Sequence, residues 1–254
     1  MLRPDHRQLP GLLMLGMLFV LDAIMIAIHG LLHVELKVAG DMWDVGTDGG
    51  YPEFLQYAKF AWIAVLLFAA AVTLRAPAML LWLPLFTYLA IDDALEIHEN
   101  AGGQLATALD LPAIGVRQQD MGELSIGGIV ITAGLILFAI GVWMSRPAVR
   151  RIFVDVLLLV GVLAFFAIVI DMVHVLVPGR TFIDAVVALV EDGGEMVAIS
   201  SILAYLFHVT LGNEAPRILQ RVRNAIPGVR RIGRETPAIA ERPRAGVPAG
   251  TPSP

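Results

Sequence analysis

Long apolar stretches alternate with short polar ones along this chain. Six apolar stretches lie at about residues 11–34, 55–74, 77–97, 124–144, 152–178 and 183–210. Each is close to the roughly 20 residues with which an α-helix crosses the hydrocarbon core of a bilayer. The pattern predicts an all-α polytopic membrane protein whose residues 1–210 form a bundle of six transmembrane helices. The first stretch is too long for the apolar part of a signal peptide, and we expect it to remain as a helix.

The composition of the 254-residue chain agrees with this prediction. Hydrophobic residues make up 57% of it and the mean hydropathy is +0.74, which is well above the values of soluble domains. The sequence contains no cysteine, and this excludes disulfides, thiolate metal sites and cysteine nucleophiles.

The connections between the apolar stretches alternate in charge. Arginines precede the first stretch and recur in every second connection, as Arg3, Arg7, Arg75, Arg146, Arg150 and Arg151. The other connections are acidic or poor in basic residues. Because basic loops stay on the cytoplasmic side, both termini are predicted to be cytoplasmic, in the inner (plasma) membrane of the cell.

The end of the chain differs in composition from the bundle. From residue 211 onward it contains eight Arg and three Glu. Residues 211–235 are predicted to form a basic juxtamembrane segment that contacts anionic headgroups. Residues 236–254, rich in Pro, Ala and Gly, are predicted to be disordered. We expect the lipid bilayer, and no nucleic acid, as a partner.

Charged side chains inside the apolar stretches are the main pointer to function. Nine carboxylates lie within or at the edge of these stretches: Asp22, Asp92, Asp93, Glu96, Glu99, Asp171, Glu191, Asp192 and Glu195. Four histidines accompany them: His29, His33, His98 and His174. Each charge at membrane depth costs at least about 2.5–3.5 kcal/mol. The same stretches contain almost no Lys or Arg, so bound divalent cations or protons are expected to neutralise the carboxylates.

The predicted orientation places all these groups in the outer half of the membrane. At about 100° per residue, Asp22, His29 and His33 share one stripe of the first helix. The same rule puts Asp92, Glu96 and Glu99 on one face of a continuous third helix, with His98 on the opposite face. Each helix thus has one polar face, and we expect these faces to line a common interior site.

The spacing of these residues suits metal ligation. Asp171-x-x-His174 has the spacing of the Glu-x-x-His pairs in di-metal carboxylate bundles, and His29-x-x-x-His33 places two imidazoles on one helix face. Oxygen and nitrogen ligands without sulfur favour Zn, Fe or Mn. The candidate ligands are Asp22, His29, His33, Asp92, Glu96, Glu99, Asp171, His174, Glu191, Asp192 and Glu195. Asp155 and Asp184 are interpreted as surface charges.

We expect a divalent metal site, possibly di-nuclear, that serves hydrolysis or redox chemistry on a lipid-like substrate. Glu96 or Glu195 is the candidate general base. One alternative is a proton-coupled cation transporter, although the inner halves of the helices are nearly free of polar groups. A second alternative is a haem-binding or structural membrane subunit.

Two short acidic strings carry a resemblance. The helix end Asp92-Asp93-Ala94-Leu95-Glu96-Ile97-His98-Glu99, together with Glu191-Asp192-Gly193-Gly194-Glu195, resembles a loosely defined group of bacterial multi-pass membrane proteins with a D-[DE]-x(4)-H-E helix end. No activity is known for that group, so the resemblance implies a membrane fold and strengthens the case for His98 and Glu99 as site residues.

Overall fold

The protein is an all-helical bundle in a computed structural model that describes residues 9–31, 42–43, 45–46, 49–113, 115–178, 181–212 and 217–226. Within this part of the chain there are six helical spans long and apolar enough to cross a membrane, and no strand. The predicted fold class is confirmed, and the chain is a multi-pass membrane protein. The predicted disordered tail, residues 236–254, lies outside the described residues, as does His33.

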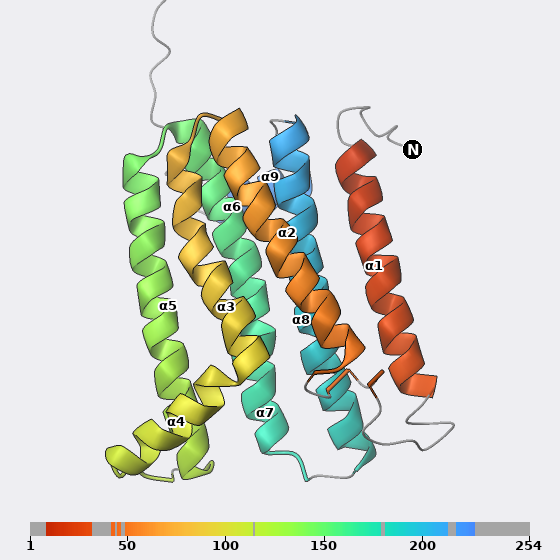
Figure 1. Cartoon of the computed structure of the whole chain (residues 1–254), viewed down its shortest axis with the longest axis vertical. Coiled ribbons are helices and arrows are strands. Elements are labelled where there is room, and N and C mark those ends of the chain that lie inside the picture. Colours follow the sequence, from red (N-terminus) through yellow and green to blue (C-terminus); the bar gives the residue numbers. More distant parts are fainter. Residues whose placement is uncertain are drawn as a thin grey trace, which may run out of the picture.

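The helices run alternately up and down (Figure 1). Their bounds are α1 Leu9–Gly30, α2 Tyr51–Thr73, η2 Pro77–Trp82, α3 Leu83–Leu95, α4 Ile97–Ala108, α5 Gln118–Met144, α6 Pro147–Ala164, η3 Phe165–Ile170, α7 Asp171–Val175, α8 Phe182–Gly212 and α9 Arg217–Ala225. η2 is a 3₁₀ segment that continues into α3, and η3 is a π-helical segment that joins α6 to α7. α5 begins six residues before the predicted stretch because Asp120 accepts a hydrogen bond from the Arg117 backbone and caps the helix.

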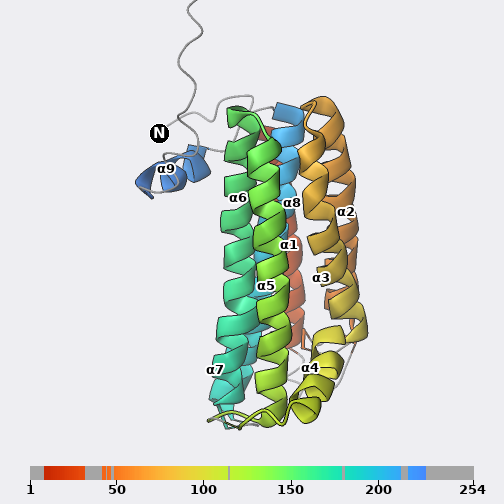
Figure 2. The same ribbon diagram turned by 90° about the vertical axis from the view of Figure 1, so that its left-hand side faces the viewer.

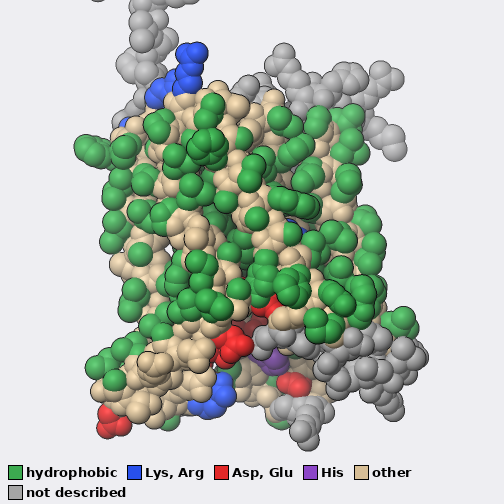
Figure 3. Space-filling model, in the orientation of Figure 1, with side chains coloured by type: hydrophobic (Ala, Val, Ile, Leu, Met, Phe, Trp, Pro, Cys, Tyr) green, Lys and Arg blue, Asp and Glu red, His purple; other side chains and the backbone are tan. Residues whose placement is uncertain are grey.

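α8 lies at the centre of the bundle. It packs against α1, α2, α6 and η3, and most of its length is buried, whereas α5 exposes apolar side chains such as Ile129 and Trp143. Ile202, Leu203 and Leu206 of α8 are fully buried in the core. On the face shown in Figure 3, hydrophobic side chains dominate the middle of the molecule, as contact with a bilayer requires.

The third predicted helix is broken at Glu96. Glu96 adopts the left-handed conformation, with φ 49° and ψ 41°, and separates α3 from α4. α4 then turns aside across the end of the bundle and packs against α5 (Figure 2). The expected single helix through Glu99 is therefore wrong, because the backbone changes direction within the acidic string.

Candidate functional site

Acidic side chains from three helices gather at one end of the bundle. α3 ends there, α7 lies there and α8 begins there (Figure 1). Asp, Glu and His side chains are visible at this end in Figure 3, below the hydrophobic surface. We call this the acidic end; the opposite end carries Arg146, Arg150 and Arg223. The grouping follows from the alternating helix directions.

Asp92 holds the start of α4. Its carboxylate accepts hydrogen bonds from the His98 backbone N–H at 2.7 Å and from the Tyr88 hydroxyl at 3.2 Å, and it lies 3.1 Å from Nδ1 of His98. The expectation that His98 faces away from Asp92 is wrong, since it assumed a helix that continues past Glu96. Asp92 therefore satisfies a backbone donor that the helix break leaves open.

The contact with Asp92 makes His98 sensitive to pH. The hydrogen bond to the Asp92 carboxylate is the largest of the effects that raise the pKa of His98 above its ordinary 6.5; burial opposes it and the charges of Glu99 and Glu123 reinforce it. Because the folded pKa is raised, the stabilisation is complete below about pH 6.5 and is lost as the pH rises through the folded pKa.

We expect an NMR titration of His98 in micelles to give a pKa above 6.5, and Asp92→Asn to lower it. The effect on stability should be below about 1 kcal/mol, because the side chain of His98 is 44% exposed and the pair is screened. A pKa unchanged by Asp92→Asn would contradict the assignment of this contact.

His174 bridges two carboxylates of α8. Its Nδ1 lies 2.7 Å from Oε2 of Glu191 and its Nε2 lies 3.2 Å from Oδ1 of Asp184. Asp184, interpreted from sequence as a surface charge, is part of the site. The side chain of Glu191 also lies close to that of Asp171. The imidazole of His174 and the carboxyl groups of Asp184, Glu191 and Asp171 thus form one connected polar cluster.

Glu195 lies at the centre of the acidic end. It is half-buried and interacts electrostatically with Asp192, Asp93, Glu191 and Asp171. Within the described part of the chain it makes no hydrogen bond and no ion pair. A carboxylate among four others is strongly destabilised as an anion unless a cation or proton joins it.

The connection between α1 and α2 lies against the acidic end. The backbone N–H of Val45 donates to Nδ1 of His29 at 3.2 Å. A Cβ at Gly46 would lie 3.1 Å from Oδ2 of Asp192. The connection thus links His29 of α1 with Asp192 of α8, and side chains larger than glycine would press on the acid.

Asp22 is placed apart from the other acids. Its Oδ1 lies 2.5 Å from Nζ of Lys59, and its Oδ2 accepts a hydrogen bond from Ser200 at 2.6 Å. Lys59 also donates to the backbone carbonyl of Met196 at 3.3 Å. Both charged groups are buried, with 0% and 1% exposure. The expectation that no Lys or Arg would pair with these acids is wrong for Asp22. Lys59 is the one lysine within the predicted apolar stretches, and its presence there could have indicated a buried ion pair.

The opposite end also holds a buried charge. Asp155 accepts two hydrogen bonds from Nη1 of Arg223, at 2.6 and 2.7 Å, and one from the Tyr205 hydroxyl at 3.0 Å. Asp155 is fully buried, so its interpretation as a surface charge is wrong. The end opposite the acids thus carries buried polar groups that the sequence interpretation did not expect.

The remaining candidates do not form a compact ligand set. Glu96 and Glu99 are exposed at the α3–α4 break. Among the described residues, no three His, Asp or Glu side chains are arranged to hold one metal ion. Asp171, His174, Glu191, Asp192 and Glu195 remain neighbours, whereas Asp22 and Asp92 have their carboxylates occupied by other partners.

Two glycines allow close packing around the acids of α8. A Cβ at Gly194 would lie 2.2 Å from the ring of Phe166 in η3, and a Cβ at Gly193 would lie 3.1 Å from Ile26 of α1. The pair thus permits a close approach of α1 and η3 to α8. The neighbouring helices are thereby drawn toward the acidic residues on either side of the pair.

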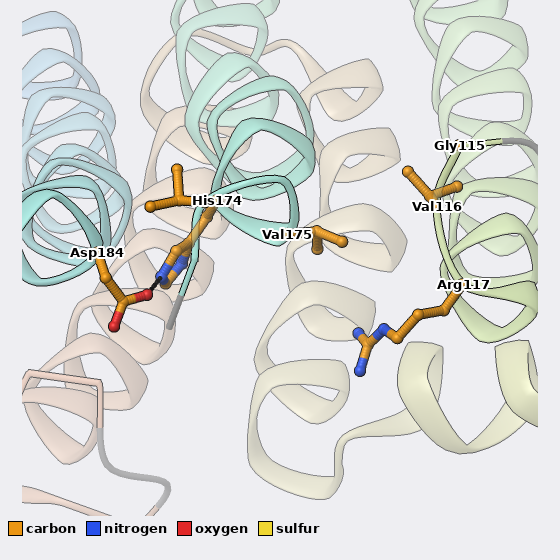
Figure 4. A pocket seen from close by; sticks show the side chains of 7 residues that line it. Gly115, Val116, Arg117, His174, Val175 and Asp184 are labelled. Atoms are coloured by element: carbon orange, nitrogen blue, oxygen red, sulfur yellow. Dashed lines mark hydrogen bonds and ion pairs between the residues drawn. The ribbon is translucent and has the colours of Figure 1, made fainter. Parts of the chain in front are cut away.

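A cavity of about 680 Å³ opens at the acidic end beside His174. Its lining combines Arg117, His174 and Asp184 with the apolar side chains of Val116, Val175 and Val177. Figure 4 shows the Arg117 side chain opposite the His174–Asp184 pair, with Val175 between them. The Asp120 carboxylate raises the pKa of Arg117 through its hydrogen bond, so the guanidinium is charged.

A sequence model of the family described as "Domain of unknown function (DUF8692)" matches residues 11–209. The chain belongs to this family. No curated protein and no solved structure gave a match. The DUF8692 match includes every residue of the acidic end that is named above and stops before α9.

Proposed function

We propose that the acidic end binds a divalent metal ion, Zn, Fe or Mn, and that the ion serves hydrolysis or redox chemistry on a lipid-like substrate. The observation that carries this proposal is Glu195, which faces four other carboxylates without a cationic partner in the described part of the chain. Oxygen ligands with one or two imidazoles favour these metals. A bound dication would relieve the repulsion that now keeps the carboxylates apart.

The orientation that we propose puts the acidic end at the outer face of the inner (plasma) membrane of a bacterium. Arg75 and Arg146 lie in connections at the opposite end, and Arg150 and Arg151 lie near the start of α6 at that end. Basic residues at the helix ends favour the cytoplasmic side. Both termini are then cytoplasmic.

The cavity beside His174 supports a lipid-like substrate. Its polar lining can bind a headgroup, while its valines can contact an apolar chain. Of the two candidate general bases, Glu195 is the better placed, because it lies among the acids that would hold the ion. Glu96 is exposed at the break between α3 and α4.

Metal analysis of the detergent-purified full chain tests this proposal. After equilibration with each metal and removal of excess, we expect about one to two ions per chain in the wild type. Glu195→Gln should weaken metal binding by at least about tenfold. A loss of about tenfold is already typical when a residue that only supports a metal ligand is removed. Asp110→Asn is the matched control, since Asp110 lies in an exposed turn at the same end of the bundle. A metal-free wild type, or equal binding by Glu195→Gln, would overturn the proposal.

A second candidate function is a proton-coupled cation transporter. The neighbouring carboxyl groups of Asp171 and Glu191 favour it, since acids that repel each other readily take up a proton. The buried polar groups Asp22 and Lys59 farther along the bundle favour it as well. In proteoliposomes, a transporter would give pH-dependent uptake of Mn²⁺ that is lost in Asp171→Asn. Stoichiometric metal without uptake would rule this candidate out and leave the metal site as proposed.

A further inference from the structure

α9 lies outside the transmembrane bundle and outside the matched family region. Figure 2 shows it at the end opposite the acids, turned sideways from the bundle beside α6. Its contacts with the bundle are to α6. A helix in this position lies at the level at which a bilayer surface would meet the protein.

An ion pair between Arg223 of α9 and Asp155 of α6, called the latch below, fixes the rotation of α9 about its own axis. Arg223 is 9% exposed and its guanidinium donates twice to the fully buried Asp155. The Tyr205 hydroxyl, also buried, supplies a further hydrogen bond to the same carboxylate. Because this buried ion pair is directional, the other residues of α9 have defined orientations relative to α6.

The two sides of α9 differ in chemistry. At about 100° per residue, Val222 lies about 100° to one side of Arg223, while Arg221 and Asn224 lie about 100–160° to the other side. Ile226 follows directly after the end of α9. Val222 is 43% exposed and Ile226 is 37% exposed. The apolar side is therefore only partly covered by the described part of the bundle, and Arg221 is exposed as well.

The segment that contains α9 is strongly basic. Residues 217–234 include six Arg and no Asp or Glu. An amphipathic helix with Arg on its polar side and aliphatic residues on the other binds the interface of anionic membranes. The positive charge of this segment therefore favours an anionic lipid surface as the partner that covers the apolar side of α9.

We propose that α9 lies in the headgroup layer of an anionic leaflet, with Val222 and Ile226 toward the acyl chains and Arg221 toward lipid phosphates. The Asp155–Arg223 latch presents the apolar side to the bilayer. This proposal is independent of the metal site, because it concerns the opposite end of the bundle.

The absence of cysteine from the sequence makes a direct test simple. Full chains carrying Val222→Cys or Asn224→Cys are labelled with a nitroxide and placed in nanodiscs of phosphatidylcholine, with or without phosphatidylglycerol. With the anionic lipid, we expect the label at position 222 to lie about 5–10 Å below the headgroups and to be accessible to oxygen, which dissolves in the membrane and speeds nitroxide relaxation. The label at position 224, the matched control, should remain accessible to a water-soluble nickel complex, which speeds relaxation of nitroxides in water.

Charge and latch are separated by two further variants on the Val222→Cys background. Arg221→Gln should move the label toward water in anionic nanodiscs, and added salt should do the same. Arg223→Gln should abolish the difference between positions 222 and 224, because the helix is then free to roll. A label at 222 that is water-accessible in anionic nanodiscs, or equally immersed in both lipids, would overturn the proposal.

Discussion

Asp22→Leu alone should destabilise the folded bundle by about 3–5 kcal/mol, whereas the double variant Asp22→Leu/Lys59→Met should recover most of this loss. The single variant leaves the Lys59 ammonium fully buried and, within the described part of the chain, with the Met196 carbonyl as its only hydrogen-bond partner. The double variant removes both charges and leaves apolar side chains of similar size. The difference arises because an unpaired charge has no water to solvate it in the bilayer core.

Equilibrium unfolding in mixed micelles of mild and denaturing detergent would measure these free energies. Val65→Ala, on the exposed side of α2, serves as the control for substitution on the helix that carries Lys59. If the double variant is as unstable as Asp22→Leu, the ion pair is not the source of the loss. If the double variant is as stable as the wild type, the ion pair adds no net stability. Its role is then to select one arrangement of the helices, since the pair ties α1, α2 and α8 together at one depth.

Gly122→Ala should destabilise the protein by about 1–3 kcal/mol or more, the usual cost of overpacking, and should loosen α4 from α5. A Cβ at Gly122 would lie 1.9 Å from the backbone oxygen of Gly102 and 3.0 Å from Cβ of Ala106. The contact at 1.9 Å is to backbone, which cannot rotate away. The two helices must therefore separate, and α4 carries His98 and Glu99 at its start.

Gly128→Ala on the same helix is the matched control, because nothing lies within 4 Å of a Cβ there. This control should be neutral or stabilising by up to about 1 kcal/mol, since alanine loses less backbone entropy than glycine in a helix. Both effects can be measured by the same detergent titration, with hydrogen exchange of the α4 amides as a local probe. Equal stability of the two variants would contradict the close packing of α4 against α5.

The buried Asp22–Lys59 pair is connected to the acidic end through α8. Gly193 and Gly194 bring α1 and η3 close to Glu191 and Glu195, and Lys59 bonds the backbone of Met196, the residue after Glu195. Changes in the buried ion pair should therefore reach the acidic site through α8. Metal affinity should fall in Asp22→Leu even though Asp22 lies apart from the other acids.

The membrane class, the six spans and the gathering of acids at one end could all be predicted from the amino-acid pattern. These follow from apolar stretches of bilayer length and from alternating helix directions, both of which are local properties of the chain. The proximity of Asp171, His174, Glu191 and Glu195 was also within reach, because these residues share depth on successive antiparallel helices.

The pairing of these charges depends on how the helices pack and could not be predicted from the sequence. Lys59 meets Asp22 across 37 residues and Arg223 meets Asp155 across 68, and helical periodicity cannot say which helices are neighbours. The left-handed residue Glu96 likewise ended the regular spacing on which the facing of His98 was calculated. Helical periodicity gives the direction of a side chain around its own helix, whereas its partner depends on the packing of helices far apart in the chain.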